Sequence, residues 1–341
     1  MDRNKRKLFW LVLAGLFCIV FLTLLTISFY GYVLEKIGVE YAENSRTYDR
    51  HFVMIVGNTE SQFWKDTYAC VREEAAGQNA YVELKGTSQS SSYTMTDFMD
   101  MSIAAKVDGI LLECTAEEAL EGKINEANEK GIPVVTILND APKTGRKSHV
   151  GINPYQLGQE YAGQIWKILP KDKDNLRITV LLHDNAIDSN QSQIFNQINN
   201  LMVTSEETQG RVRVEEIRIS SERAFESEEI VWNLFQNEQG APDIIVCMDE
   251  VDTEAVYQAV IDYNRVGETQ ILGYYKSPAT LEAVRRGTMA MSLYIDTEQM
   301  GKYSVQAMME CIRDGRTNSF YSVDLQFVNS DNVSGFVRKA H

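Results

Sequence analysis

The chain has 341 residues, of which 24% are charged and 44% hydrophobic, and its formal net charge is −15. This length is sufficient for two globular lobes of ordinary domain size. The excess of 48 acidic over 33 basic residues argues against nucleic acid as a partner, because proteins that bind it neutralise phosphates with Lys and Arg.

The cysteines and histidines show no pattern of a chemical site. Five cysteines are too few for a disulfide scaffold, and no pair has the spacing of metal ligands. The four histidines are scattered, and none lies in a Ser/His/Asp or H-E-x-x-H context. We therefore expect neither an enzyme nor a bound metal or cofactor.

The N-terminus predicts the compartment. Residues 1–7 carry four basic side chains, and residues 8–34 contain no charge, a run longer than the ~20 residues that a spanning helix needs. The run exceeds a signal-peptide core, and no clean cleavage site follows. We expect an uncleaved transmembrane signal anchor with 1–7 in the cytoplasm and a polar stalk at 35–50. Lipidation of Cys18 is disfavoured, because Phe17 is not small.

From residue 52 onward, apolar strands alternate with amphipathic helices. This order predicts parallel sheets covered by helices on both faces. One sheet of all these strands would be unusually wide, so two doubly wound α/β lobes fit better. Helix-ending left-handed caps are expected at Gly77, Gly131, Gly267 and Gly287. Strands are expected at 52–57, 79–84, 108–112, 133–138, 176–182, 211–219, 243–247, 270–274 and 290–294, and helices at 117–130, 154–168, 251–264 and 297–314.

The stretch 51–77 shows the unit from which the fold is built. Its strand has Val, Ile and Met on both faces, which is typical of a buried parallel strand. A short turn places Phe63 and Trp64 at the strand's carboxyl end, where open α/β sheets bind ligands. The alternative interpretation is that this pair is a hydrophobic staple on the following helix.

Three longer stretches carry a family resemblance. They are VDGILLECTAEEALEGKINEANEKGIPVVTILND (107–140), HVGINPYQLGQEYAG (149–163) and ILGYYKSPATLEAVRRGTMAMSLYIDTEQMG (271–301). Together with the opening strand and its QFW turn, they resemble the type I periplasmic binding proteins for sugars, the group of the ribose-binding protein and the ligand domains of lac-repressor-like regulators. The resemblance covers roughly residues 50–330.

The resemblance implies that the chain crosses three times between two lobes. The crossings are expected near Ile152–Asn153, Ile295–Asp296 and Ser322–Val323. The membrane-proximal lobe would then comprise 51–152 plus 296–322, and the second lobe 153–295 plus 323–341. A ligand between the lobes would draw them together by hinge closure.

The resemblance also implies a ligand site. Sugars present an apolar face that stacks on aromatic rings and hydroxyls that bond to amides and carboxylates. The family positions map to Phe63, Trp64, Asn139, Asp140, Asn153, Tyr155, Asn190, Phe225, Asp249, Tyr275 and Tyr294.

Several of these positions have a structural alternative. Asn139 and Asp140 are also typical of a turn, and Phe225 of ordinary core packing. Asp249, which precedes Glu250, is equally suited to capping the next helix.

The second wall of the site departs from the family. The segment SNQSQIF has Asn190, Ser192 and Gln193 where an arginine is expected, Met248 replaces an asparagine and Tyr275 replaces an aspartate. This wall has lost charge and gained aromatic and amide groups, which argues against a simple ribose or galactose specificity.

The resemblance implies a membrane-anchored extracytoplasmic solute-binding protein that serves an ABC-type importer through its permease. The alternative is a ligand-sensing module working with a membrane histidine kinase or receptor. A third possibility is a scaffold that has lost its ligand.

Overall fold

The computed structural model describes residues 16, 20–26, 28, 48–88, 92–115, 118–183, 190–219, 226–237 and 240–337. The chain divides into two units, Met1–Thr47 and Tyr48–His341. In the first unit, residues 20–26 are helical. Within the described residues, no helix reaches the length and hydropathy that a membrane crossing requires. Most of the expected 8–34 anchor, together with 1–7 and 35–47, lies outside those residues.

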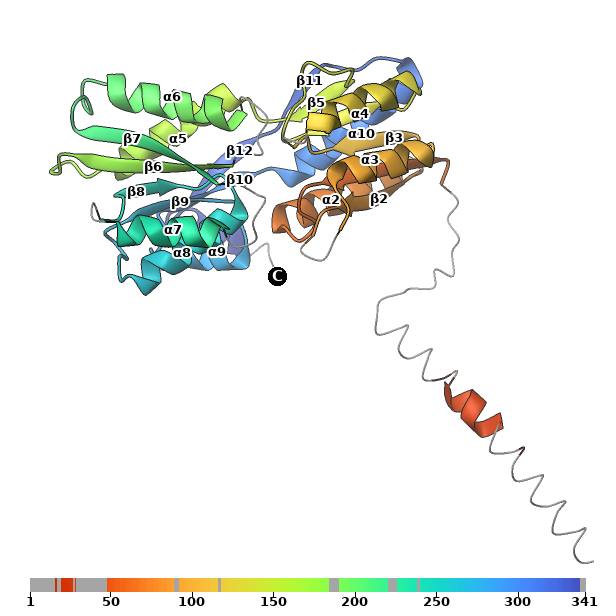
Figure 1. The fold of residues 1–341 in the computed structure, drawn as a ribbon, viewed down its shortest axis with the longest axis horizontal. Helices are drawn as coiled ribbons and strands as arrows, with labels where there is room; N and C mark the ends of the chain where they lie inside the picture. The colour runs from red at the N-terminus through yellow and green to blue at the C-terminus, as the bar shows by residue number, and fades with distance from the viewer. Residues whose placement is uncertain are drawn as a thin grey trace, which may run out of the picture. The chain divides into compact units, whose positions relative to one another are not determined.

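The second unit contains two six-stranded sheets, which define its first and second lobes (Figure 1). The first sheet has the order β11-β5-β4-β3-β1-β2, and all its pairs are parallel. Its strands are β1 (Arg50–Val56), β2 (Ala80–Gly86), β3 (Gly109–Leu112), β4 (Val134–Ile137), β5 (Ser148–Gly151) and β11 (Phe320–Ser322).

The second sheet has the order β12-β10-β9-β8-β6-β7. It is parallel except for the antiparallel pair of β10 and β12. Its strands are β6 (Leu176–His183), β7 (Val212–Ile219), β8 (Ile244–Val246), β9 (Gln270–Tyr274), β10 (Met291–Ile295) and β12 (Leu325–Asn329). The predicted class, two α/β lobes with parallel sheets, is confirmed.

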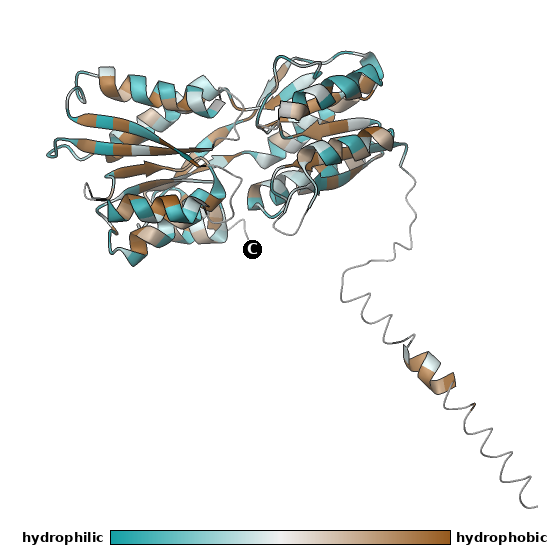
Figure 2. Ribbon diagram, viewed as in Figure 1, coloured by the Kyte–Doolittle hydropathy of each residue, from teal (hydrophilic) through white to brown (hydrophobic). Residues whose placement is uncertain are grey.

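Helices cover both sheets, with polar residues toward solvent and apolar strands inside (Figure 2). Figure 1 shows α5 and α6 on one face of the second sheet and α7, α8 and α9 on the other. The first lobe has α2 (Gln62–Gly77), α3 (Met95–Ala104), α4 (Glu118–Glu129) and α10 (Thr297–Asp314). The second has α5 (Pro154–Ile168), α6 (Asn190–Thr204), α7 (Glu226–Gln236), α8 (Glu250–Asp262), α9 (Pro278–Arg285) and α11 (Val333–Val337).

The chain passes between the sheets after β5, after β10 and after β11. The three passing segments are hydrogen-bonded to one another. The Val323 N–H donates to the carbonyl of Gly151 (2.9 Å), and the Asp296 N–H donates to that of Asp324 (3.0 Å). These bonds hold the crossings side by side as a three-strand hinge.

The strands are buried on both faces, as the parallel order requires. Residues Phe52–Val56 of β1 are all 0% exposed. One apolar cluster includes residues of both sheets and of the crossings, such as Val56, Ile152, Ile295 and Leu272. The lobes therefore share a core through the hinge.

Three of the four expected glycine caps are confirmed. Gly131, Gly267 and Gly287 have φ values of 79°, 83° and 73°. The expectation for Gly77 is wrong, because Gly77 is the last residue of α2 and the left-handed residue is Asn79, with φ 57°. Asparagine tolerates this conformation better than most residues.

Candidate functional site

Polar groups follow the strands of the first lobe at their carboxyl ends. Glu113 comes directly after β3, and its carboxylate accepts hydrogen bonds from the N–H of Gly57 (2.8 Å) and the amide of Asn139 (3.4 Å). Burial raises the pKa of Glu113 to about 7, and the charge of Asp249 adds to this rise. Asp249 belongs to the second lobe, so the carboxyl ends of β3 and β8 face each other.

Asp249 and Glu250 point in different directions. Asp249 caps α8, because its side chain accepts the N–H of Val251 (2.7 Å). Glu250 reaches the first lobe, where it accepts hydrogen bonds from the Ser61 hydroxyl and from the Phe63 N–H (3.3 Å). Burial also raises the pKa of Glu250. The N-terminus of α2, with its positive partial charge, thus binds a carboxylate from the opposite lobe.

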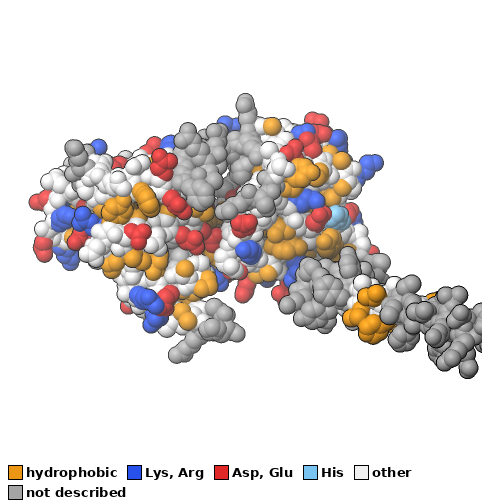
Figure 3. Space-filling view, turned by 60° about the horizontal axis from the view of Figure 1, so that its bottom comes forward, with side chains coloured by type: hydrophobic (Ala, Val, Ile, Leu, Met, Phe, Trp, Pro, Cys, Tyr) orange, Lys and Arg blue, Asp and Glu red, His pale blue; other side chains and the backbone are white. Residues whose placement is uncertain are grey.

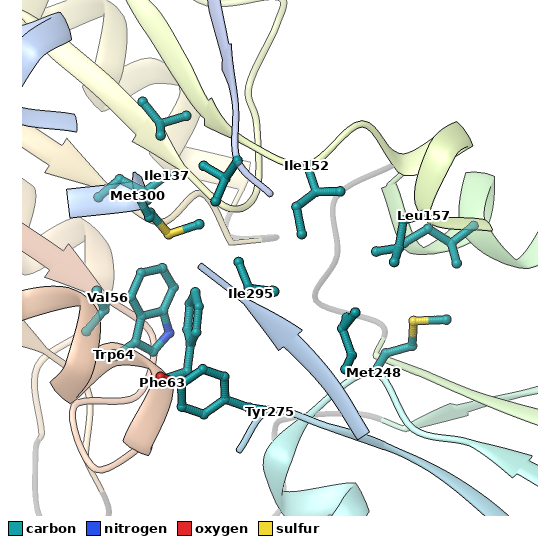
Figure 4. Packing of buried hydrophobic residues seen from close by; sticks show 14 of the residues in the cluster. Val56, Phe63, Trp64, Ile137, Ile152, Leu157, Met248, Tyr275, Ile295 and Met300 are labelled. Carbon is teal, nitrogen blue, oxygen red and sulfur yellow. The ribbon is translucent and has the colours of Figure 1, made fainter. Parts of the chain in front are cut away.

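Aromatic rings from the two lobes meet beside this carboxylate. The Phe63 ring lies 5.2 Å from that of Tyr275 and 6.3 Å from that of Tyr274, both edge-on. Figure 4 shows the rings of Phe63 and Tyr275 lying against each other. The Tyr275 hydroxyl donates to Asp66 on α2 (2.5 Å). The lobes are therefore joined by both ring contact and hydrogen bonds.

Tyr275 has an unusual backbone. Its φ is +62°, a conformation that costs an L-residue roughly 1–2 kcal/mol. Its carbonyl accepts hydrogen bonds from the hydroxyls of Ser292 (2.6 Å) and Thr280 (3.1 Å). These two hydroxyls hold the turn after β9 in the geometry that directs the Tyr275 ring toward the first lobe.

Two predicted site residues of the first lobe are used inside that lobe. Trp64 is 4% exposed and belongs to the apolar cluster with Val56 and Met300 (Figure 4). Asp140 accepts hydrogen bonds from Thr136 (2.8 Å) and from the Arg146 guanidinium (2.6 Å). Both side chains are thus engaged within the first lobe.

The remaining predicted residues lie around the hinge and on the second lobe. Asn153 caps α5 by accepting the Tyr155 N–H (2.9 Å), and the Tyr155 side chain is 57% exposed. Tyr294 lies beneath the Lys276 ammonium group, 4.5 Å from its ring centre. Asn190 is the first residue of α6, and its side chain lies outside the described part. Phe225 lies outside the described residues altogether.

Sequence reasoning missed Glu113 and Asp66. Glu113 had a usable signal, because it is the first charged residue after the apolar strand GILL. Asp66 had none, since a polar residue in the second turn of a helix is ordinary. Its role depends on a tyrosine 209 positions away.

The site is distinct from two cavities at the opposite, amino ends of the sheets. One, of about 930 Å³, borders Arg50 and Pro133, and the other, of about 420 Å³, borders Arg177 and Arg213.

Figure 3 shows Asp and Glu side chains gathered near the middle of the face that it draws. Within the described part of the chain, no group of His, Cys, Asp and Glu is arranged to hold a metal ion.

Comparisons with known proteins agree with this architecture. A family model described as "Periplasmic binding protein domain" matches residues 52–317. No curated protein matches the chain. Among solved structures, the glucose-galactose binding protein GanP from Geobacillus stearothermophilus has a TM-score of 0.73 at 22% identity, covering 83% of this chain and 98% of its own.

Two further structures share the fold. The XylFII-LytSN complex matches with a TM-score of 0.70 at 24% identity, covering 83% of this chain and 98% of that chain. The arabinose binding protein AraP from Geobacillus stearothermophilus matches with a TM-score of 0.66 at 20% identity, covering 84% and 99%. At these identities the likeness establishes the fold alone.

Proposed function

Because this chain belongs to the periplasmic binding protein family, we propose that it is a solute-binding protein whose lobes close on a sugar or sugar-like small molecule. The domain from Tyr48 onward lies outside the cytoplasm, and the apolar segment 8–34 anchors it in the membrane. The ligand is passed to an ABC-type importer. The solved relatives that are named for glucose, galactose and arabinose support the ligand class.

The observation that carries the proposal is the meeting of the two lobes at the carboxyl ends of their strands. Glu113 and Asn139 contribute polar groups from one side and Asp249 from the other. The rings of Phe63 and Tyr275 lie beside them. Carboxylates, amides and ring faces are the groups that bind sugar hydroxyls and C–H surfaces.

The proposed ligand set follows from these contacts. It adds Glu113 to the positions that the resemblance implied, and it retains Tyr155, Asn190, Phe225 and Tyr294. It leaves out Trp64, which packs inside the first lobe, and Asp140, which is bound by Arg146. It retains Phe63 and Tyr275, whose rings meet between the lobes, and also Asn153 and Asp249, although each caps a helix.

A saccharide screen of the full chain in neutral detergent tests the proposal. A bound ligand raises the melting temperature by mass action, and calorimetry then gives the affinity of each hit. Asp249→Asn retains a good helix cap but removes the charge, and Glu113→Gln retains the acceptor for Gly57. We expect each to weaken binding about tenfold or more, as the loss of a hydrogen bond to a charged group does.

Glu254→Gln is the matched control, because Glu254 is an exposed residue of α8. It is expected to bind as the parent does. Two outcomes would refute the proposed site. One is that no neutral mono- or disaccharide binds, and the other is that a saccharide binds both variants as tightly as it binds the parent.

The alternative function, ligand sensing through a membrane histidine kinase or receptor, is favoured by one comparison. The XylFII-LytSN complex is a protein of this fold assembled with a second protein. Cells from which this protein has been deleted distinguish the two roles. If the protein is an importer component, these cells fail to take up the labelled ligand. A sensor is required for the transcriptional response to that ligand, while uptake continues.

A further inference from the structure

A second candidate site lies at the amino end of the first sheet, away from the proposed sugar site. It is the half-open cavity of about 930 Å³, bordered by the starts of β1 and β4 and the ends of α3, α4 and α10. Four cationic side chains line it: Arg50, Lys106, Lys130 and Lys147. In a chain with a net charge of −15, such a group is unexpected.

Few acidic groups offset these charges. The one carboxylate in the lining, Asp108, is bound by Arg50 (3.1 Å) and by the His51 N–H (2.8 Å). Lys130 pairs with Glu126 (2.7 Å). Lys106 and Lys147 have no ion pair among the residues that the structure describes.

The backbone at Lys106 is a second, independent observation. Three helices end at this cavity, and each is followed by a residue with positive φ: Lys106 (53°), Gly131 (79°) and Gly315 (68°). Glycine adopts this conformation without steric cost, whereas an L side chain does not. The backbone of the turn after α3 therefore does not favour a lysine over glycine, and the Lys106 side chain is present at the cavity at some steric cost.

The helix ends themselves oppose an anion. The C-terminus of a helix carries a partial negative charge of about half an elementary charge, and lysines at such ends offset it. Counted against Asp108, Glu126 and these partial charges, the four cations leave a small positive balance at the cavity.

We propose that this cavity binds a phosphate group, carried by a lipid headgroup or by a soluble phosphate ester. Lysine is suited to phosphate as a point charge. Arg50 begins β1 two residues after Tyr48, so the chain enters the domain at this cavity. If 8–34 is anchored as proposed above, residues 35–47 reach at most about 45 Å, and headgroups lie within that range. The soluble alternative does not depend on the anchor.

Calorimetric titration of the full chain in neutral detergent, with glycerol phosphate and inorganic phosphate as probes, tests the site. We expect saturable binding that weakens as salt is added, because the cations are exposed. Lys147→Gln and Lys106→Gly are each expected to weaken it about fivefold, the loss of one exposed charge contact. Lys106→Gly also relieves the left-handed strain, so its melting temperature is expected to stay level or rise.

Lys302→Gln is the control, since Lys302 is exposed on α10 and does not line the cavity. Repeating the titration in nanodiscs separates the two sources of phosphate. If glycerol phosphate binding is lost in phosphatidylglycerol nanodiscs but not in phosphatidylcholine nanodiscs, the site is assigned to a lipid headgroup. If glycerol phosphate binds in both kinds of nanodisc, the site is assigned to a soluble ester. No saturable binding, or binding that neither lysine variant weakens, overturns the proposal, whatever the saccharide screen shows.

Discussion

Glu113 is a partly buried carboxyl group that is subject, across the lobes, to the charge of another carboxylate, Asp249. Its pKa of about 7 has burial as its main cause, followed by Asp249, while the bonds from Gly57 and Asn139 lower it. Opening the lobes would admit water to this group and move Asp249 away. The protonation of Glu113 is therefore coupled to closure.

This pKa predicts a pH dependence of stability. The ordinary pKa of the Glu113 carboxyl is 4.5, and in the folded protein it is about 7. Between these two pH values the folded protein keeps the Glu113 proton while the unfolded chain loses it. Stability should fall as the pH rises through this window, by roughly 3 kcal/mol in total, and should level off above it. Glu113→Gln should flatten the curve when melting temperatures are measured from pH 4.5 to 8. Glu254→Gln should retain the slope, and an unchanged slope in Glu113→Gln would contradict the assignment.

Tyr275 predicts a closure defect that leaves the fold intact. Tyr275→Phe keeps the ring against Phe63 but removes the hydrogen bond to Asp66. The closed state should become less populated, and the affinity for the ligand should fall roughly tenfold. Solution scattering with and without ligand measures the shift. Tyr81→Phe, at an exposed residue of β2, serves as the comparison, and equal effects from the two variants would argue against the interlobe bond.

Several site residues show where prediction from sequence ends. A polar residue just after a parallel strand lies at the correct edge of the sheet, and this much was predictable for Asn139, Asp140 and Asp249. Which way each side chain points depends on partners distant in sequence or on the local helix. Arg146 binds Asp140, and the N–H of Val251 engages Asp249.

At the scale of elements, α2 and α10 pack with unusually close backbones. A Cβ at Gly301 would lie 2.7 Å from the Cβ of Cys70 and 2.9 Å from its carbonyl carbon. Because α2 carries Phe63 and Asp66, this contact fixes the position of one wall of the proposed site.

A pair of glycine substitutions tests that contact. Gly301→Ala should force the helices apart and cost about 1–3 kcal/mol of unfolding free energy. Gly122→Ala on α4, where a Cβ meets nothing within 4 Å, should be neutral or stabilise by up to about 1 kcal/mol. Chemical denaturation measures the unfolding free energy of both variants. If Gly301→Ala left it unchanged, the interface between α2 and α10 would be able to relax around the added methyl group.

Long elements were predictable and short ones were not. The bounds of α5 and α10 agree with the expected 154–168 and 297–314, because Asn153 and Asp296 cap them and their apolar periodicity is sustained. The strands β5, β11 and β12 were not among the expected strands. They have three to five residues each, and β11 and β12 pair with partners far away in the chain, so local pattern does not reveal them.

At the scale of the whole molecule, the shared apolar cluster predicts one unfolding transition. The cluster contains Trp64 of the first lobe and continues through Ile295 into the second. A Trp64 reporter and a Trp166 reporter, each made by replacing the other tryptophans with phenylalanine, should give coincident fluorescence transitions. Trp166 lies on α5 and is 39% exposed. Separate midpoints would show that the hinge does not couple the lobes.

The existence of two lobes was predictable from the strand count and the β/α order. Their membership was not, since periodicity does not say that α10 and β11 return to the first sheet. That expectation came only from the family resemblance. Long-range return of a segment is decided by packing of complementary faces, which a single sequence does not display.

This return sets the order in which the protein can be completed during synthesis. The first lobe needs α10 and β11, which are translated after the whole stretch from α5 to β10. The sheet of the second lobe is complete only after β12, the last strand in the described part of the chain, has been translated. Because domains generally fold as they emerge from the N-terminal end, a nascent chain here reaches residue 319 with both sheets unfinished. A product truncated before α10 has β5 as a bare edge and α2 without its helical partner, and these exposed surfaces make it a target for proteolysis.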